Sequence, residues 1–334
     1  MLGNIVFKRI TTMSSFLTEH SGDAPRINWQ LGDTVSELRK RRSKWRTDQQ
    51  RANENNGREL PSPDVVREAI KAVIQALFPM RLGPADLREE SEDFYVGYTL
   101  DVAFNALFDQ ARLELDYAAR RGQGDSCPKG QRDCAERILK GFAAALPAIR
   151  EQLDGDIVAA YRGDPAARSV DEVLLCYPGV DAIIHHRLAH YFYSQGLLML
   201  ARIISEQAHS STGIDIHPGA TIGKSFFIDH GTGVVVGETA IIGDNVRIYQ
   251  AVTLGAKRFP EGEDGHLEKG QPRHPIVEDD VVIYAGATIL GRITIGKGSI
   301  VGGNVWLTRG VPAGSSVSQT SMANGKPIQQ AEEL

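Results

Sequence analysis

An aliphatic or small residue returns at every sixth position of the chain from Ile216 onward. A first series ends at Val252 and a second begins at Val277. Neither an α-helix nor a β-hairpin has this period. A six-residue repeat indicates a parallel β-helix, in which hexads form triangular coils and the aliphatic residues stack inside. The repeated positions are Ile216, Ile222, Ile228, Val234, Ala240, Val246, Val252, Val277, Ile283, Ile289, Ile295, Val301 and Leu307.

The interruption between the two series, residues 255–275, is rich in Gly, Pro and charged residues. Such a segment cannot continue stacked strands, so we expect it to leave the β-helix as an extruded loop. Long loops on a rigid scaffold are commonly functional. The chain has 34 glycines, and their density rises from Gly213. We therefore expect the β-helix over residues 213–314 and a C-terminal tail over 315–334.

The chain before residue 213 has the pattern of amphipathic helices. Ser62, Pro63 and Asp64 form a capped helix start, and apolar residues follow at helical spacing up to Leu77. Similar patterns cover 96–115, 134–142 and 180–202. We expect a helical domain over 61–212 that caps the open end of the β-helix. Residues 1–60 are polar, and we expect a mobile arm or a lone helix there.

Charge and hydropathy narrow the class of protein. The chain has 37 Lys and Arg against 42 Asp and Glu, a net charge of −5, so we expect no nucleic-acid or membrane partner. No apolar stretch approaches the roughly 20 residues of a membrane helix, and no secretion signal is evident, so we expect a cytoplasmic protein. Cys127, Cys134 and Cys176 contain no CxxC pair, so neither a disulfide framework nor a zinc ribbon is expected.

Two histidines of the repeat region lie next to residues that suggest chemistry. His230 follows Asp229, and Asp215 precedes it by fifteen residues, close to the length of one coil. A carboxylate behind a histidine fixes its tautomer and supports its imidazolium, as a general base requires. His274 follows Arg273 where the loop re-enters the β-helix. From spacing alone, surface histidines that satisfy turns remain the alternative interpretation.

Longer strings carry a family resemblance. They are RGDPAAR from residue 162, CYPGVDAIIHHRLAHYFYSQG from 176, GIDIHPGATIG from 213, IDHGTGVVVGETAIIGDNV from 228 and RHPIVEDDVVIYAGATILGRITIG from 273. Together they resemble the hexapeptide-repeat serine O-acetyltransferases, in their long bacterial form, over about residues 60–320. The resemblance implies an α+β fold in which an N-terminal helical domain precedes a left-handed parallel β-helix with an extruded loop.

The same resemblance implies an acetyltransferase that moves the acetyl group of acetyl-CoA to the hydroxyl of L-serine in cysteine biosynthesis. It implies that His230 is the general base, that Asp215 orients it, and that His274 completes the catalytic set. No covalent enzyme intermediate is needed in such a direct transfer.

For the amino-acid substrate, the resemblance implies that Asp164 and Asp229 hold the ammonium group. Arg273 would pair with the carboxylate, and His274 would complete the serine pocket beside it. An amino-acid zwitterion needs an anionic and a cationic partner in fixed positions, which this set supplies.

For the co-substrate, the resemblance implies a groove lined by Gly255, Ala285 and Gly303, whose small size lets the pantetheine arm lie close to the backbone. Lys257 is a candidate for the phosphates. No metal is expected.

The implied partners are a second and third copy of the chain, in a homotrimer or a dimer of trimers whose active site takes its two histidines from neighbouring subunits. L-cysteine is implied as a feedback inhibitor. Docking of O-acetylserine sulfhydrylase on the tail that ends in Glu333 and Leu334 is left open.

Two alternatives belong to other classes. Zinc hydratases of the carbonic-anhydrase type use the same prism with three histidines around a metal, and His217, His230 and His274 could supply them, but DPAA and RHP would then have no purpose. A non-catalytic scaffold for cysteine synthase would leave Asp215, His230 and Arg273 unexplained.

Overall fold

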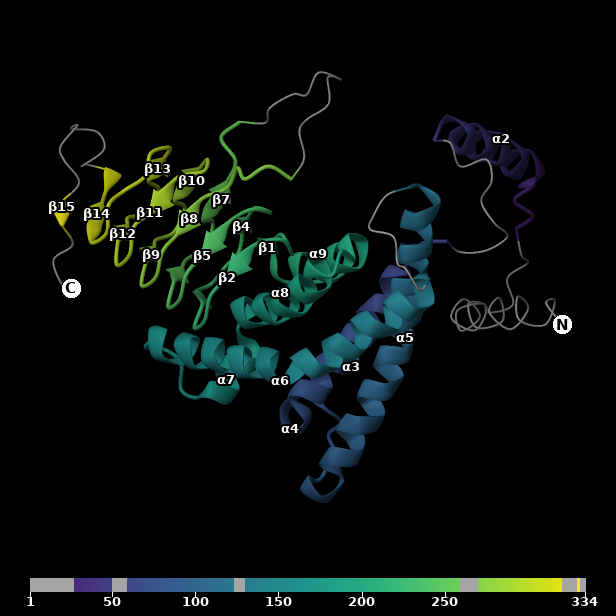
Figure 1. Cartoon of the computed structure of the whole chain (residues 1–334), viewed down its shortest axis with the longest axis horizontal. Helices are drawn as coiled ribbons and strands as arrows, with labels where there is room; N and C mark the ends of the chain where they lie inside the picture. The colour runs from purple at the N-terminus through teal and green to yellow at the C-terminus, as the bar shows by residue number, and fades with distance from the viewer. Residues whose placement is uncertain (1–26, 50–58, 123–129, 259–269, 320–328, 331–334) are drawn as a thin grey trace. The chain divides into compact units, whose positions relative to one another are not determined.

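The computed structural model describes residues 27–49, 59–122, 130–258, 270–319 and 329–330. The chain divides into two compact units, Met1–Gly57 and Arg58–Leu334. In the first unit the structure describes one helix, α2 (Gly32–Asp48), which buries no residue. The arm expected over 1–60 therefore contains a lone helix, and residues 1–26 and 50–58 of that arm lie outside the described residues. The helical part and the β-helix belong together to the second unit (Figure 1).

The helices of the second unit begin where the apolar pattern predicts. Pro63 occupies the first turn of the first of them and Asp64 adds a favourable negative charge there. The pattern over 180–202 becomes two helices because Gly196, at φ +80°, ends the first one. The helices are α3 (Pro63–Leu77), α4 (Pro79–Leu82), the 3-10 turn η1 (Glu89–Ser91), α5 (Glu92–Arg120), α6 (Gln131–Gly163), α7 (Val170–Cys176), α8 (Pro178–Ser194) and α9 (Leu198–Thr212).

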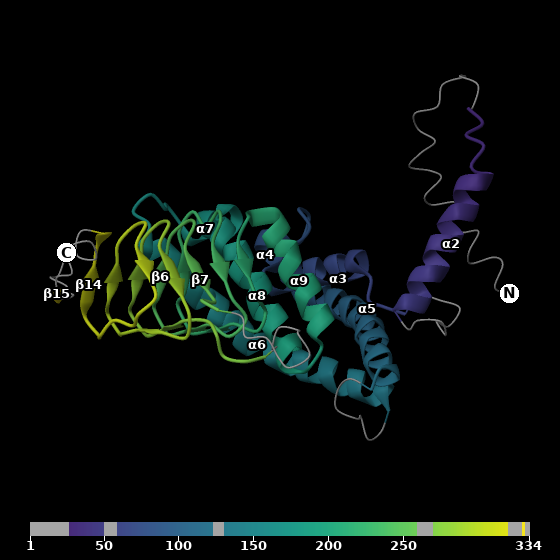
Figure 2. The ribbon, with the colours of Figure 1, turned by 90° about the horizontal axis from the view of Figure 1, so that it is seen from above.

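The repeat region is the expected left-handed β-helix of stacked coils (Figure 2). Each of the first four coils contributes one short strand to each of three sheets, and successive coils pair in parallel. All thirteen residues of the six-residue series are buried. Sheet A holds β1 (Asp215–Ile216), β4 (Val235–Val236), β7 (Thr253–Gly255), β10 (Thr288–Leu290) and β13 (Trp306–Leu307). Sheet B holds β2 (Thr221–Ile222), β5 (Ile241–Ile242), β8 (Ile276–Val277) and β11 (Thr294–Ile295); sheet C holds β3 (Phe227–Ile228), β6 (Arg247–Ile248), β9 (Val282–Ile283), β12 (Ile300–Val301), β14 (Ser315–Val317) and β15 (Gln329–Gln330).

The first coil is longer than the six-residue series suggests. Ile216 pairs with Val236 and not with Val234, so this coil is two residues longer than three hexads. The extra length lies in the turn between β3 and β4, where Gly231 and Gly233 have φ of +91° and +78°. Val234 and the three members of the series that follow it are buried. Each of them lies two residues before the residue that its strand buries. The six-residue period is still visible in the sequence, because each of these hexads buries two residues that lie two positions apart.

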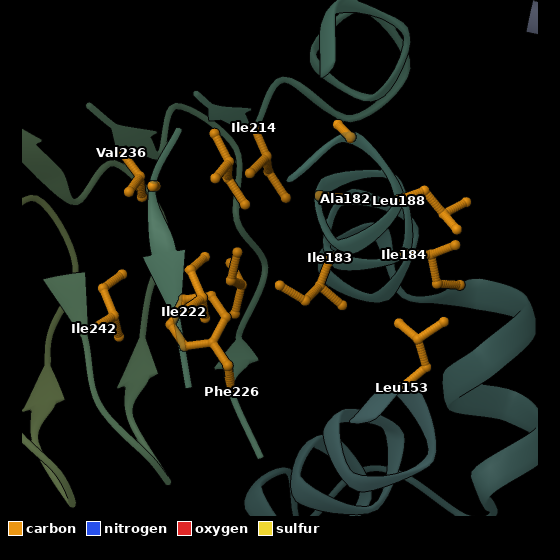
Figure 3. Packing of buried hydrophobic residues seen from close by; sticks show 14 of the residues in the cluster. Leu153, Ala182, Ile183, Ile184, Leu188, Ile214, Ile222, Phe226, Val236 and Ile242 are labelled. Atoms are coloured by element: carbon orange, nitrogen blue, oxygen red, sulfur yellow. The ribbon is translucent and has the colours of Figure 1, made fainter. Parts of the chain in front are cut away.

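Helices α6, α8 and α9 contact the first coil, and their apolar side chains continue its core. Figure 3 shows Ile183 of α8 and Leu153 of α6 on the helical side, with Ile222 and Phe226 on the side of the coil. Gly179 permits a close approach of α8 to the coil, because a Cβ there would lie 2.3 Å from the carbonyl oxygen of Ile228. The end of the β-helix is thereby covered by helices.

The other boundaries differ slightly from expectation. β14 continues sheet C beside β12, so the parallel stack reaches Val317, and β15 pairs with β14 in antiparallel fashion. Most of the extruded loop lies outside the described residues. The tail residues Glu333 and Leu334, to which the possible docking of O-acetylserine sulfhydrylase is assigned, also lie outside them. Cys134 is disulfide-bonded, contrary to the expectation from the cysteine spacing, whereas Cys176 is a free, exposed thiol. In the described part of the chain no helix is long and apolar enough to cross a membrane.

Candidate active site

The candidate residues lie at two different corners of the prism. The turns that lead from sheet C to sheet A, here called the C–A corner, carry Asp229 and His230. The turns that lead from sheet A to sheet B, here called the A–B corner, carry Arg273 and His274. Sheet A separates the two corners within one chain, so they form two half-sites.

The half-site at the C–A corner also includes Asp164, which follows α6. Its carboxylate accepts hydrogen bonds from the Tyr177 hydroxyl and, at 2.8 Å, from the backbone N–H of Ala166. These bonds, with a smaller contribution from the charge of His230, lower the pKa of Asp164. The same bond raises the pKa of Tyr177 to about 12. Asp164 is therefore held ionised close to His230.

His230 is presented to solvent by the extra-long turn. Its backbone is left-handed, at φ +58°, a conformation that His tolerates better than most residues. Its side chain is 71% exposed, and its Nε2 lies 3.9 Å from the Oδ1 of Asp229. The imidazole is thus accessible and next to a carboxylate.

Asp215 starts the first coil on β1, whereas His230 lies at its end. Among the described residues no hydrogen bond joins the two side chains. The Asp215 carboxylate instead lies near Glu206 and His209, with ligand atoms of the three residues within 4.8 Å of one another. The orienting role of Asp215 stays a prediction.

The half-site at the A–B corner is organised by an ion pair. Arg273 donates from Nη2 to the Oε2 of Glu238 at 2.6 Å, and the hydroxyl of Tyr193 donates to Oε1 at 2.9 Å. Burial opposes ionisation of Glu238, but these two hydrogen bonds lower its pKa. Tyr193 comes from α8, so a helix contributes to the position of the guanidinium.

His274 is buried beside this ion pair, with 6% of the residue exposed. Burial, and then the charge of Arg273, lower the pKa of His274 to about 4. Thr239 contacts its ring at Nδ1. Sequence reasoning assigned no role to Tyr193, Glu238 or Thr239, although all three lie inside the strings that carry the resemblance.

The residues implied for coenzyme A are divided between the corners. Ala285 and Gly303 lie on successive coils of the C–A corner with His230, and a Cβ on Gly303 would lie 3.2 Å from the Ala285 carbonyl oxygen. Gly255 ends β7 and Lys257 follows it, exposed, on the far side of sheet A.

The zinc alternative requires His217, His230 and His274 to converge. His217 and His274 lie at the A–B corner and His230 at the C–A corner. Within the part of the chain that the structure describes, the one group of three potential ligands is that of Glu206, His209 and Asp215. A single chain therefore does not assemble the three-histidine site.

Comparison with known proteins agrees with this architecture. Residues 274–309 match the family model "Bacterial transferase hexapeptide (six repeats)". A plasmid-encoded serine acetyltransferase of Synechococcus elongatus is 56% identical over 264 residues, which cover 79% of this chain and 83% of the relative. The serine acetyltransferase of Bacillus subtilis is 47% identical over 182 residues, covering 53% of this chain and 80% of the relative.

Solved structures give the same result. Serine acetyltransferase 1 of Entamoeba histolytica, in complex with L-cysteine, has a TM-score of 0.63 and 35% identity, covering 77% of this chain and 87% of that one. Isoform 3 from the same organism, in complex with cysteine, has a TM-score of 0.62 and 33% identity, covering 89% and 97%. With such extensive identity to curated relatives and the same prism, this chain belongs to the serine acetyltransferase family.

Proposed function

We propose that the chain transfers the acetyl group of acetyl-CoA to the hydroxyl of L-serine, giving O-acetyl-L-serine and CoA. The observation that carries the proposal is the charge arrangement of the two half-sites. One presents the carboxylates of Asp164 and Asp229 beside an exposed imidazole, and the other presents the guanidinium of Arg273. These groups match the ammonium, the hydroxyl and the carboxylate of serine.

In the proposed reaction His230 accepts the proton of the serine hydroxyl as its oxygen attacks the thioester carbonyl. The C–S bond then breaks, and the imidazolium of His230 returns the proton to the departing thiolate, so no atom or charge is left over. Asp229 supports the transient imidazolium at 3.9 Å. Asp215 would orient His230 once its carboxylate turns from Glu206 and His209 toward the imidazole.

The assay that tests this proposal measures thiol release from acetyl-CoA with purified protein. We expect release that depends on L-serine, with O-acetylserine detected by mass spectrometry. D-serine and L-alanine serve as controls, because the first misplaces the hydroxyl and the second lacks it. Thiol release that does not depend on an amino-acid hydroxyl would overturn the proposal.

The separation of the corners leads to a proposal about assembly. Because sheet A lies between His230 and Arg273–His274 in one chain, we propose that a neighbouring copy supplies Arg273 and His274 to each His230, in a trimer or a dimer of trimers. Co-expression of His230→Ala and Arg273→Ala chains with different tags tests this. At low serine concentration, mixed oligomers should be far more active than either variant alone; no gain of activity in mixed oligomers would contradict the shared site.

In the same assembly Ala285 and Gly303 would line the path of the pantetheine arm toward His230, and Gly255 and Lys257 would reach it from the neighbouring A–B corner. The small side chains at these positions leave backbone groups accessible to an amide-rich ligand.

A further inference from the structure

The hydroxyl of Thr239 uses its full hydrogen-bonding capacity on the Arg273–His274 segment. Its Oγ1 accepts the backbone N–H of Arg273 at 2.9 Å and that of His274 at 3.1 Å. A threonine hydroxyl has two acceptor lone pairs and one proton. With both lone pairs occupied, its proton is directed at the remaining neighbour, the Nδ1 of His274, at 2.9 Å.

The same nitrogen faces a second donor. The backbone N–H of Thr239 lies 3.1 Å from the Nδ1 of His274. A backbone N–H can only donate, so Nδ1 must be an acceptor and cannot carry a proton. A neutral imidazole then carries its proton on Nε2, and the imidazolium would set an N–H at Nδ1 against two donors.

Gly237 leaves room for the ring, and Arg292 fixes the backbone on both sides of it. A Cβ at Gly237 would lie 2.1 Å from Nε2 of His274, so only glycine leaves room for the ring. Arg292 donates from Nη1 to the carbonyl oxygens of Thr239 and His274, at 2.6 and 3.0 Å. Its guanidinium thus joins two segments that lie on successive coils of the A–B corner.

The surrounding charges also oppose a charged ring. Arg273, Arg292 and His217 face His274 and disfavour its imidazolium, and Glu238 alone favours it. Burial of the ring disfavours its imidazolium in the same direction as these three groups. Among the described residues, Nε2 has no hydrogen-bond partner, so its proton is free for a ligand.

We infer that Thr239 is a positioning residue that locks His274 as a neutral hydrogen-bond donor through Nε2, and that His274 therefore cannot act as a base. The inference rests on the proposed function, because it assigns His274 the task of donating to an oxygen of the reacting serine and thioester. His230 is then the one histidine of the proposed site that can take the serine proton.

The direct test is the ring tautomer, measured by ¹⁵N NMR on histidine-labelled protein. The signals of His274 are assigned by their loss in His274→Gln. We expect an unprotonated Nδ1 and a protonated Nε2 that do not titrate between pH 5.5 and 8. A proton on Nδ1, or titration near pH 6.5, would overturn the inference, and neither result depends on whether serine is the substrate.

The kinetic test compares Thr239→Val, which removes the hydroxyl at similar size, with Thr239→Ser, which keeps it. In Thr239→Val we expect kcat/KM for serine to fall about 10²-fold, the usual cost of a misplaced group, and its pH profile to gain an ionisation below neutrality. Thr239→Ser should restore both. The matched control is Thr221→Val, on the exposed face of β2.

If Thr239→Val loses activity without any change in the pH profile or the tautomer, the lock is wrong and Thr239 has only a structural role. Circular dichroism and the size of the oligomer establish that the variants remain folded. The NMR experiment on the wild-type protein stands independently of both variants.

Discussion

His230 and His274 have the same side chain and opposite surroundings. His230 is exposed on a left-handed turn beside Asp229, where a substrate can reach its imidazole. His274 is buried among hydrogen-bond donors and cations, where an imidazolium is disfavoured. At the scale of single residues, the proposed division into a base and a donor follows from these environments.

The first prediction concerns the base. His230→Ala should lower kcat by about 10²- to 10⁴-fold, the usual contribution of a positioned general base. Asp215→Asn should lower it less, because orientation is disturbed while the base remains. Steady-state kinetics measure both, and the melting temperature should stay unchanged because the His230 side chain is exposed. Turnover near the wild-type value would remove His230 from the mechanism.

The second prediction concerns Arg273. Arg273→Ala should raise the KM for serine far more than the KM for acetyl-CoA, because the guanidinium is assigned to the amino-acid carboxylate. Lys257→Ala, in the segment assigned to the coenzyme, is the matched control and should show the reverse preference. Equal effects of Arg273→Ala on both KM values would mean that this residue serves the coenzyme.

The third prediction is a pH dependence of stability. His186 on α8 is fully buried, and burial, followed by the charges of His190, Arg187 and His217, holds its pKa well below 6.5. The unfolded chain binds a proton at this histidine near pH 6.5, whereas the folded chain does not. The free energy of unfolding is therefore undiminished by His186 above that pH and decreases as the pH falls below it.

The melting temperature should therefore drop less between pH 7.5 and 5 in His186→Leu than in the wild type. His185, whose pKa is raised despite burial because Asp181 binds it, has the opposite effect but is present in both proteins. Scanning fluorimetry at matched ionic strength measures the two slopes. Equal slopes of melting temperature against pH in the two proteins would show that His186 does not cause this pH dependence.

At the scale of elements, a buried ion pair joins the helices to the first coil. Arg187 on α8 donates to Asp156 on α6 at 2.6 and 2.8 Å, and its guanidinium also donates to the carbonyl oxygens of Ile222 and Gly223. Asp156 in turn accepts the backbone N–H of Phe226 at 2.9 Å. The first coil has no preceding coil to pair with, so these side chains satisfy backbone groups that the ladder leaves open.

The fourth prediction follows from that ion pair. Arg187→Met should lower the free energy of unfolding by about 3–5 kcal/mol, because it leaves the carboxyl of Asp156, whose pKa burial already raises, without its partner in the interior. Urea unfolding measures the loss. The double variant Arg187→Met with Asp156→Leu should recover part of it, since no isolated charge remains. A single variant as stable as the wild type would show that the pair does not hold the two elements together.

At the scale of the whole molecule, the same half-sites should admit an inhibitor. L-cysteine has the ammonium and carboxylate of serine and a thiol in place of the hydroxyl, and two solved relatives carry cysteine. The fifth prediction is inhibition by L-cysteine that is competitive with serine, measured by initial rates. N-acetylcysteine, which lacks the ammonium, should inhibit far less. Inhibition that persists undiminished at saturating serine would contradict a shared pocket.

Much of this molecule could be predicted from the chain alone. The helix start at Pro63 and the thirteen buried hexad positions follow from residue types and their spacing, because burial of a repeated face is a local requirement. The family strings also named His230 and Arg273 as site residues, and their roles stay predictions. The longer first coil, the helix end at Gly196 and the strand at Ser315–Val317 were not anticipated.

The sequence by itself determined that a helical domain precedes a β-helix, because periodic apolar residues can be buried in few ways. Only the tertiary structure decided which side chains meet. Thr239 and His274 are brought together by the stacking of coils across the extruded loop, and Tyr193 reaches Glu238 from a helix. Such contacts depend on register, and two additional residues in one turn are enough to move the remaining members of the first six-residue series off the strand positions, until the series from Val277 returns to them.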